Sequence, residues 1–423
     1  MTAHAGVCVP KVRAGPKKSI EKFPIWYDIH KYLGRKPWYV IRDLIEEYSR
    51  AGDTVLDIFA GSGVASFEAL RLDRKVIALD HSQLSELITK VLCNPCQPAE
   101  YEKAMLNVIK GLEALENIYK VKTRIGTGIL QYWVPELHKG KLVIKGKIVE
   151  VENISDVDFP YNKDVRSFSW EHAKERIPKV YGSNIFTWDE VFSKRSQYVL
   201  YNALGLINRV NSIPVRMALL VAFSAAIEKI SLLNHAKTGK RGWIRDKQTC
   251  YYKHLDFIEF NAIEALKNKF AKVSKALVDT TELLKGNQGG FEFVRKGAET
   301  IDYSDAVDLI LMDPPYLEEV PYDKLEALHD IWLGFSPQIQ NIGNSFNTIS
   351  LHCNSALKKD GRLVLLMLNY EPESKKFFID RLERNGFMKT YEKGSKGRVK
   401  EGLTIVVFKK SLKKEKISVH LNQ

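Results

Sequence analysis

The tetrapeptide Asp-Pro-Pro-Tyr at 313–316 follows the apolar run at 307–312 and has the residue types for chemistry on an amine. A buried strand would deliver the Asp313 carboxylate at its carboxyl end. The prolines have a fixed φ and no N–H group, so they would hold the Pro314 carbonyl outward beside that carboxylate. Two adjacent acceptors suit an exocyclic NH2 group, and Tyr316 offers a flat face for a base. A surface turn is the competing interpretation, which the preceding apolar run disfavours. The predicted catalytic residues are Asp313, Pro314, Pro315 and Tyr316.

A second motif, Asp-Ile-Phe-Ala-Gly-Ser-Gly at 57–63, places glycines at the end of the apolar run 54–59. Small residues there let a ligand approach the backbone at the start of a helix, at the carboxyl edge of a sheet. The spacing differs from the Gly-x-Gly-x-x-Gly of a dinucleotide site. Asp80 ends the next apolar run, 75–80, where it could accept hydrogen bonds from ribose hydroxyls. A purely structural strand–helix turn remains the alternative.

Both motifs lie at strand ends in a pattern typical of a doubly wound α/β sheet. Periodicity predicts helices at 64–72 and 375–387, with Gly386 ending the second, and the Lys-Lys-Asp-Gly at 358–361 predicts a turn. We therefore expect a Rossmann-like sheet domain formed by residues 1–100 and 290–412, followed by a basic tail at 413–423. The predicted strands are 54–59, 75–80, 291–297, 307–313, 361–368 and 403–410.

Residues 101–289 interrupt the sheet and form an expected, mostly helical insertion. Apolar spacing predicts helices at 193–210 and 215–233, and alternation around a glycine predicts a β-hairpin at 141–152. Residues 101–290 have 30 basic and 20 acidic side chains, so they hold +10 of the net charge of +13. Such a one-sided excess is typical of a polyanion binder, although a solvated lysine-rich surface would look the same.

Within the insertion, residues 235–254 interleave basic and aromatic side chains. Basic groups reach phosphates, while aromatic rings can stack on unpaired bases or fill the gap that a flipped base leaves. A solvated basic loop is the alternative. The predicted DNA-binding residues are Lys240, Arg241, Trp243, Arg245, Tyr251 and Tyr252.

Composition excludes several other classes of protein. The chain has 423 residues, of which 45% are hydrophobic and 27% charged, as in ordinary globular domains. No apolar run is long enough to span a membrane, and the N-terminus lacks the apolar core of a signal peptide. Five cysteines predict a reducing cytoplasm rather than a disulfide framework. Cys93 and Cys96 form a single Cys-x-x-Cys without a second pair, so we expect no metal site.

Taken together, Val-Leu-Asp-Ile-Phe-Ala-Gly-Ser-Gly and Leu-Ile-Leu-Met-Asp-Pro-Pro-Tyr resemble the motifs of AdoMet-dependent DNA amino-methyltransferases, which modify N6 of adenine or N4 of cytosine. The resemblance covers residues 25–100 and 185–410. The motif order resembles the α arrangement, in which the insertion contains the target-recognition region. The resemblance implies AdoMet as cofactor, with Glu299 offset by one residue from the acid that contacts the adenine ring. The implied cofactor contacts are Lys36, Pro37, Asp57, Phe59, Ala60, Gly61, Gly63, Asp80 and Glu299.

The chemistry follows from the lone pair of an aromatic amine, which is delocalised into the ring. Hydrogen bonds from both N–H groups to Asp313 and the Pro314 carbonyl would favour a pyramidal nitrogen, and the protein would orient the in-line methyl transfer. A base inside a duplex must first be flipped out, with Tyr316 as its stacking partner.

The expected function is therefore methylation of double-stranded DNA, and the resemblance favours adenine N6 over cytosine N4. If the protein serves restriction–modification, the restriction endonuclease would be a separate chain. Two other classes stay open: an RNA guanine-N2 methyltransferase and a non-catalytic DNA-binding module. The basic excess in an insertion disfavours the first, and the two intact motifs disfavour the second.

Overall fold

The computed structural model describes most of the chain between Pro24 and Ser411. Of the helices within these ranges, none is long and apolar enough to cross a membrane. The described residues are 24–32, 34–123, 126–137, 139–151, 165, 167–179, 183–236, 243–244, 251–317, 322–336, 342–394 and 402–411.

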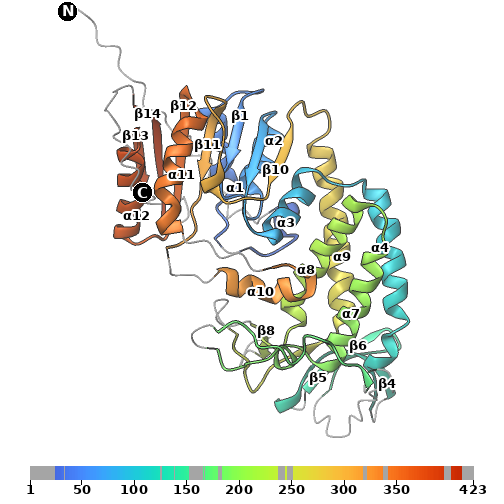
Figure 1. Cartoon of the computed structure of the whole chain (residues 1–423). Coiled ribbons are helices and arrows are strands. Elements are labelled where there is room, and N and C mark those ends of the chain that lie inside the picture. Colours follow the sequence, from blue (N-terminus) through green and yellow to red (C-terminus); the bar gives the residue numbers. More distant parts are fainter. Residues whose placement is uncertain are drawn as a thin grey trace, which may run out of the picture.

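A seven-stranded sheet forms the upper body of the molecule in Figure 1, in the order β10-β2-β1-β11-β12-β14-β13. The strands run parallel except β14, which is antiparallel to β12 and β13. The order of connection reverses between β1 and β11, where such sheets bind ligands. This is the expected Rossmann-like sheet. The strands are β1 (Thr54–Asp57), β2 (Lys75–Leu79), β10 (Phe291–Val294), β11 (Val307–Met312), β12 (Leu357–Leu368), β13 (Phe387–Gly394) and β14 (Leu403–Lys410).

Helices cover both faces of this sheet because successive strand residues point to opposite sides. Val55 of β1 packs with residues of α1 and α2, such as Phe67. Its neighbour Leu56 packs on the other face with residues of α11 and α12, such as Phe346 and Phe378. The sheet is therefore buried on both sides, which explains its continuous apolar strands. These helices are α1 (Trp38–Tyr48), α2 (Val64–Arg71), α11 (Ile342–Ala356) and α12 (Pro372–Arg384).

A second body is built around α8, whose buried residues lie on all sides of the helix. It packs against α3, α4, α7, α9 and α10 (Figure 1). A helix that is apolar all round is expected at the centre of a helical core. The predicted helices at 193–210 and 215–233 correspond to α7 and α8. The helices of this body are α3 (Gln83–Cys93), α4 (Pro98–Glu113), α6 (Trp188–Val191), α7 (Lys194–Asn208), α8 (Ile213–Ile230), α9 (Ala262–Leu283) and α10 (Tyr322–Leu333).

The insertion also contains an antiparallel sheet of five strands in the order β3-β4-β5-β6, in which β9 pairs with Tyr132 and Trp133 of β4 in addition. The predicted hairpin at 141–152 is its β5–β6 pair, turned at Lys145 and Gly146 with positive φ. The remaining strands of the insertion were not predicted. For β9 the reason is that its pairing partner, β4, is far away in the sequence. The strands of the insertion are β3 (Lys120–Thr123), β4 (Gly126–Val134), β5 (Lys139–Ile144), β6 (Lys147–Val151), β7 (His235–Ala236), β8 (Trp243–Ile244) and β9 (Glu259–Phe260).

Two helices cross the domain boundaries expected from the sequence. Helix α4 begins at Pro98, spans the expected break at residue 100 and packs on α9. Helix α10 belongs to the C-terminal segment but packs against the insertion, where Trp332 stacks on Trp170 with ring centroids 4.0 Å apart. The insertion therefore shares one hydrophobic core with α3 and α10.

Two local expectations for the sheet domain are corrected. Residues 358–361 do not form a turn before the strand. They lie inside β12 as an irregularity, where the register against β11 shifts between Val307↔Leu357 and Leu309↔Arg362. The second correction is β13, an unpredicted strand that begins directly after Gly386, where the backbone has a φ of +85°.

The described residues also form short 3-10 helices, which are η1 (Ile25–Asp28), η2 (Glu116–Tyr119), η3 (Pro135–Leu137) and η4 (Ala298–Thr300).

Candidate active site

The carboxyl ends of β1 and β11 open into a cavity of about 910 Å³. Its walls come from the segment before α1, the glycine turn after β1, the Asp-Pro-Pro-Tyr segment and α10. Three of the predicted catalytic and cofactor residues are described by the structure but do not line the cavity: Pro37, Gly63 and Glu299. The predicted residues that do are Lys36, Asp57, Phe59, Ala60, Gly61, Asp80, Asp313, Pro314, Pro315 and Tyr316.

Asp57 ends β1 as a buried carboxyl group at the base of the cavity. Burial raises its pKa to about 7, and the charges of Asp313 and Asp80 act in the same direction. The Ser66 hydroxyl opposes this shift by donating a hydrogen bond of 2.7 Å to the carboxylate. Ionisation of Asp57 is therefore costly at this buried position and would become easier beside a bound cation.

The two glycines of the turn have different roles. Gly61 has a φ of +50°, and a Cβ atom there would lie 3.0 Å from the Tyr32 ring. Gly63 has a φ of +74° and precedes α2, where a Cβ atom would lie 2.9 Å from the Thr89 hydroxyl oxygen. Gly61 thus keeps the turn narrow at the cavity wall, whereas Gly63 allows α2 to pack closely on α3.

Asp80, at the end of β2, is held by two backbone donors. The N–H of Gly61 donates to one carboxylate oxygen at 2.8 Å, and the N–H of Ser82 donates to the other at 2.9 Å. These bonds tie the glycine turn of β1 to the end of β2. The carboxylate is consequently oriented before any ligand arrives, with lone pairs left for further donors.

Asp313 follows β11 and forms an ion pair with Lys36, which also donates to the Gly34 carbonyl at 2.9 Å. The Lys36 side chain is 5% exposed, whereas that of Asp313 is 29% exposed on the cavity side. Burial raises the pKa of Asp313, and the Lys36 ammonium opposes that effect. Lys36, which the resemblance implies as a cofactor contact, therefore also reaches the predicted catalytic carboxylate.

The carbonyl of Pro314 already accepts a hydrogen bond, which the Tyr370 hydroxyl donates. The Tyr370 ring stacks on Tyr316 with centroids 4.8 Å apart and an interplanar angle of 23°. The Tyr316 hydroxyl donates to the Leu368 carbonyl at 2.6 Å. One face of Tyr316 is thus covered and its ring is fixed. A carbonyl oxygen has two lone pairs, so Pro314 can accept a second hydrogen bond.

Two carboxyl groups of α10 complete the acidic wall, and sequence reasoning missed both. Burial raises the pKa of Glu326 to about 8 and that of Asp330 to about 7. The Ser82 hydroxyl donates to Glu326 at 2.8 Å. In the sequence these two acids are visible only as an i, i+4 pair on a helix that also has buried apolar positions. The pair becomes informative only once the packing of α10 against the cavity is known.

The predicted DNA-binding residues fare differently. Lys240, Arg241 and Arg245 lie outside the described residues, and for Trp243 only its backbone, in β8, is described. The expectation for Tyr251 is corrected: it is 1% exposed and its hydroxyl donates to the Lys324 carbonyl at 2.6 Å, so its ring packs in the core. Tyr252 is half-buried and packs edge-on against His254.

Glu299 lies in η4, which packs against α11. A Cβ atom added to Gly297 would meet its carboxylate at 2.1 Å, so the side chain folds back over its own loop. Glu299 is not among the residues that line the cavity, and its contact with the adenine ring stays a prediction.

Residues 9–90 match the family model for DNA methylases, N6_N4_Mtase. This match confirms the resemblance to the N6-adenine/N4-cytosine DNA methyltransferase family for the segment that carries the glycine motif and Asp80. The chain has no match among curated proteins.

Several solved methyltransferases are similar to the chain in fold. An rRNA methylase from Streptococcus thermophilus has 8% identity and a TM-score of 0.30, covering 90% of this chain and 99% of its own. The rRNA methyltransferase aviRa from Streptomyces viridochromogenes has 9% identity and a TM-score of 0.29, covering 90% and 88%. A Burkholderia thailandensis 1,6-didemethyltoxoflavin-N1-methyltransferase with bound S-adenosylhomocysteine has 12% identity and a TM-score of 0.21, covering 32% and 56%. Scores this low add nothing to what the sheet order itself establishes.

Proposed function

We propose that the protein transfers a methyl group from AdoMet to the exocyclic amine of a flipped base in duplex DNA, with adenine N6 favoured over cytosine N4. The observation that carries the proposal is the meeting, in one cavity, of the glycine turn after β1, the fixed Asp80 carboxylate and the Asp313 and Pro314 acceptors. The DNA methylase match over residues 9–90 supports DNA as the substrate.

The acidic walls of the cavity suit AdoMet, which would supply a methyl group activated on its sulfonium. Asp80 has lone pairs left for ribose hydroxyls, and the narrow turn at Gly61 lets a ligand approach the backbone. Asp57 and Glu326 ionise reluctantly because they are buried together with other acids. A cation in the cavity would favour their ionised forms, so binding of a positively charged ligand would be linked to deprotonation of these carboxyls.

The target amine would donate its two hydrogens to the Asp313 carboxylate and the Pro314 carbonyl. Lys36 favours the ionised, accepting form of Asp313, because its ammonium opposes the rise in pKa that burial causes. Tyr370 holds the Pro314 carbonyl in place through its hydroxyl. The lone pair of the amine is then available for attack, and the protein orients that attack rather than activating the methyl group.

The target base would stack on the face of Tyr316 opposite Tyr370. The basic insertion would hold the DNA backbone, since phosphate contacts by lysine and arginine supply most of the affinity for a duplex. A restriction endonuclease in a separate chain stays a prediction.

Mass spectrometry of nucleosides tests the proposal directly. Duplex DNA is incubated with AdoMet and the purified protein, and we expect N6-methyladenine. Asp313→Ala serves as the inactive variant, and Asp302→Ala, which removes an exposed carboxylate, is the matched control. A product that is solely N4-methylcytosine would overturn the base assignment. Methylation of RNA without methylation of DNA would overturn the substrate class, and AdoMet binding without any transfer would favour a non-catalytic module.

A further inference from the structure

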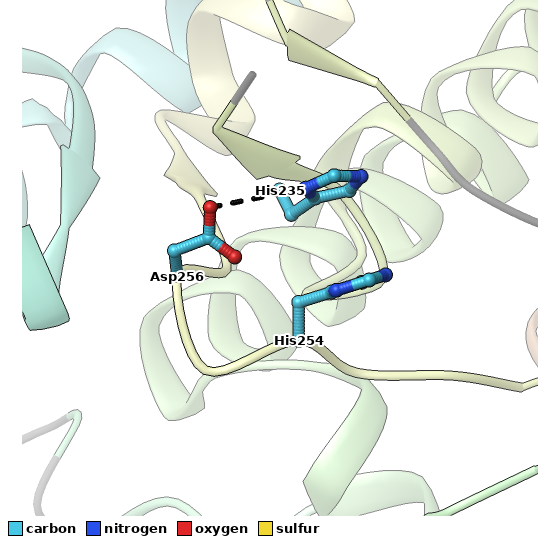
Figure 2. A group of neighbouring side chains, drawn as sticks. All are labelled: His235, His254 and Asp256. Carbon is cyan, nitrogen blue, oxygen red and sulfur yellow. Dashed lines mark ion pairs between the residues drawn. The ribbon is translucent and has the colours of Figure 1, made fainter. Parts of the chain in front are cut away.

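We propose that His235, His254 and Asp256 form a zinc site in the insertion, outside the catalytic cavity (Figure 2). One donor atom from each residue lies within 4.8 Å of the others. The two imidazole rings are stacked with centroids 3.9 Å apart, and His235 Nδ1 lies 3.8 Å from the Asp256 carboxylate. Two imidazoles and one carboxylate are a donor set that Zn²⁺ favours.

The backbone around these residues is a short ladder that fixes two of the three ligands. The N–H of Ala236 donates to the Asp256 carbonyl at 3.1 Å, and the N–H of Ile258 donates to the Asn234 carbonyl at 2.8 Å. Asn234 is itself tied to the end of α8, because its side-chain amide donates to the Glu228 and Ser231 carbonyls at 2.9 Å. Ligands on such a frame lose little freedom when they bind a metal.

His254 is positioned from its other side by Tyr252, whose ring packs edge-on against it with centroids 4.7 Å apart. The site is reachable from solvent, since the side chains of His235 and Asp256 are 12% and 30% exposed. Zinc with ligands at about 2.0–2.2 Å needs donor atoms about 3.3 Å apart. Rotation of the side chains can supply this approach, and water can fill the fourth position of a tetrahedral ion.

The position of the site in the sequence suggests what a bound metal would do. His235 and His254 are the first and last residues of the basic and aromatic segment 235–254. A metal bound to both would hold the two ends of the segment at a fixed separation, which we expect to favour binding of a ligand to it. This consequence rests on the proposed function, because it assumes that the segment contacts DNA. The sequence led us to expect no metal site in this protein, and the present proposal departs from that expectation. It does not involve Cys93 and Cys96, whose thiols are buried in different hydrophobic cores.

The metal content of the full chain, purified without a metal-binding tag, tests the site. After incubation with zinc sulfate and desalting, we expect about one zinc per chain, as for a single structural site. His235→Ala/His254→Ala should lose it, as should the milder His254→Gln, and circular dichroism shows whether each variant folds. His172→Ala removes an exposed histidine elsewhere and should keep the metal. Zinc retained by folded His254→Gln and double-variant proteins, or no zinc on the wild type, would overturn the site.

Cobalt and DNA binding separate this site from the proposed function. Co²⁺ bound to the wild type should give visible d–d absorption that His254→Gln lacks, which is a readout independent of methyl transfer. Removal of zinc should weaken duplex binding several-fold and leave AdoMet affinity unchanged. Equal DNA affinity with and without zinc would overturn the proposed effect of the metal on the basic and aromatic segment. If the metal binds but no DNA is methylated, the proposed function fails while the zinc site stands.

Discussion

The candidate active-site cavity and the insertion differ in how their charged groups are arranged. The cavity brings together carboxyl groups from β1, β2, β11 and α10 beside basic residues such as Lys36, and burial raises the pKa of several of the carboxyls. The insertion holds +10 of the net charge of +13. A cluster of carboxyls suits a small cationic cofactor, whereas a basic surface suits a polyanion. Strand ends build the first environment, and an inserted segment builds the second.

The two regions also differ in how their residues are held. In the cavity, Asp80 is fixed by two backbone donors, and Pro314 by Tyr370. Geometry of this kind serves a reaction, in which small displacements are costly. Phosphate contacts tolerate more freedom, since attraction between charges falls off slowly with distance. Substitutions in the cavity should therefore affect turnover, and substitutions in the basic segment should affect DNA affinity.

Asp313→Ala should have the largest effect. Loss of the carboxylate removes one acceptor for the amine, and we expect methyl transfer to fall by at least about 100-fold. AdoMet affinity should change little, because Asp313 faces the target amine. Tritium transfer from labelled AdoMet and calorimetric binding measure the two quantities separately. More than a tenth of the activity remaining would contradict the catalytic assignment, and Asp57→Ala is the converse variant, expected to weaken AdoMet binding first.

Neutralising Lys240, Arg241 and Arg245 together should have the next largest effect, on DNA alone. For every phosphate that the protein no longer neutralises, the slope of log affinity against log salt should fall by about 0.9. Binding is measured by fluorescence anisotropy over a range of salt concentrations. Lys358→Gln, in β12 on the sheet domain, is a control for removal of a lysine elsewhere. An unchanged slope would move the DNA footprint away from this segment, to the β5–β6 hairpin for example.

Tyr370→Phe should have a moderate effect on turnover. The variant keeps the ring that stacks on Tyr316 but loses the hydrogen bond to the Pro314 carbonyl. One hydrogen bond is worth about 0.5–1.5 kcal/mol, so kcat should fall about 3- to 10-fold. KM for AdoMet should stay constant. Tyr391→Phe in β13 is the matched control, and a change in KM rather than kcat would show that Tyr370 supports cofactor binding instead.

The comparison also explains what the sequence could predict. The strands of the seven-stranded sheet other than β13, and both motifs, were predictable because a parallel sheet buries continuous apolar runs and places Asp57, Asp80 and Asp313 at one edge. The roles of Tyr370 and Glu326 were not predictable. Tyr370 meets Pro314 only through the packing of a later loop, and Glu326 reaches the cavity only through the packing of α10. Composition also cannot separate a buried aromatic ring from a stacking one, which is why Tyr251 was misassigned.

Glu326→Gln should give the smallest effect, a pH-dependent gain of a few degrees in Tm. Burial raises the pKa of Glu326 in the folded protein to about 8, above its value of about 4.3 in an unfolded chain. Between these values the folded state binds more protons than the unfolded state, so this carboxyl makes stability fall as pH rises from about 4.3 through about 8. Glutamine cannot ionise and escapes that loss.

The Tm of Glu326→Gln minus that of the wild type should therefore be most positive at pH 8–9 and should shrink as pH falls towards the unfolded value of about 4.3. Thermal melts without AdoMet across this range measure the difference. Glu373→Gln, an exposed carboxyl in the first turn of α12, is the control. A difference that does not vary with pH would mean that Glu326 ionises freely in the cavity. Glu326 would then offer a cation an ionised carboxylate at neutral pH, and carboxyls with a pKa raised by burial would be limited in this cavity to groups such as Asp57 and Asp330.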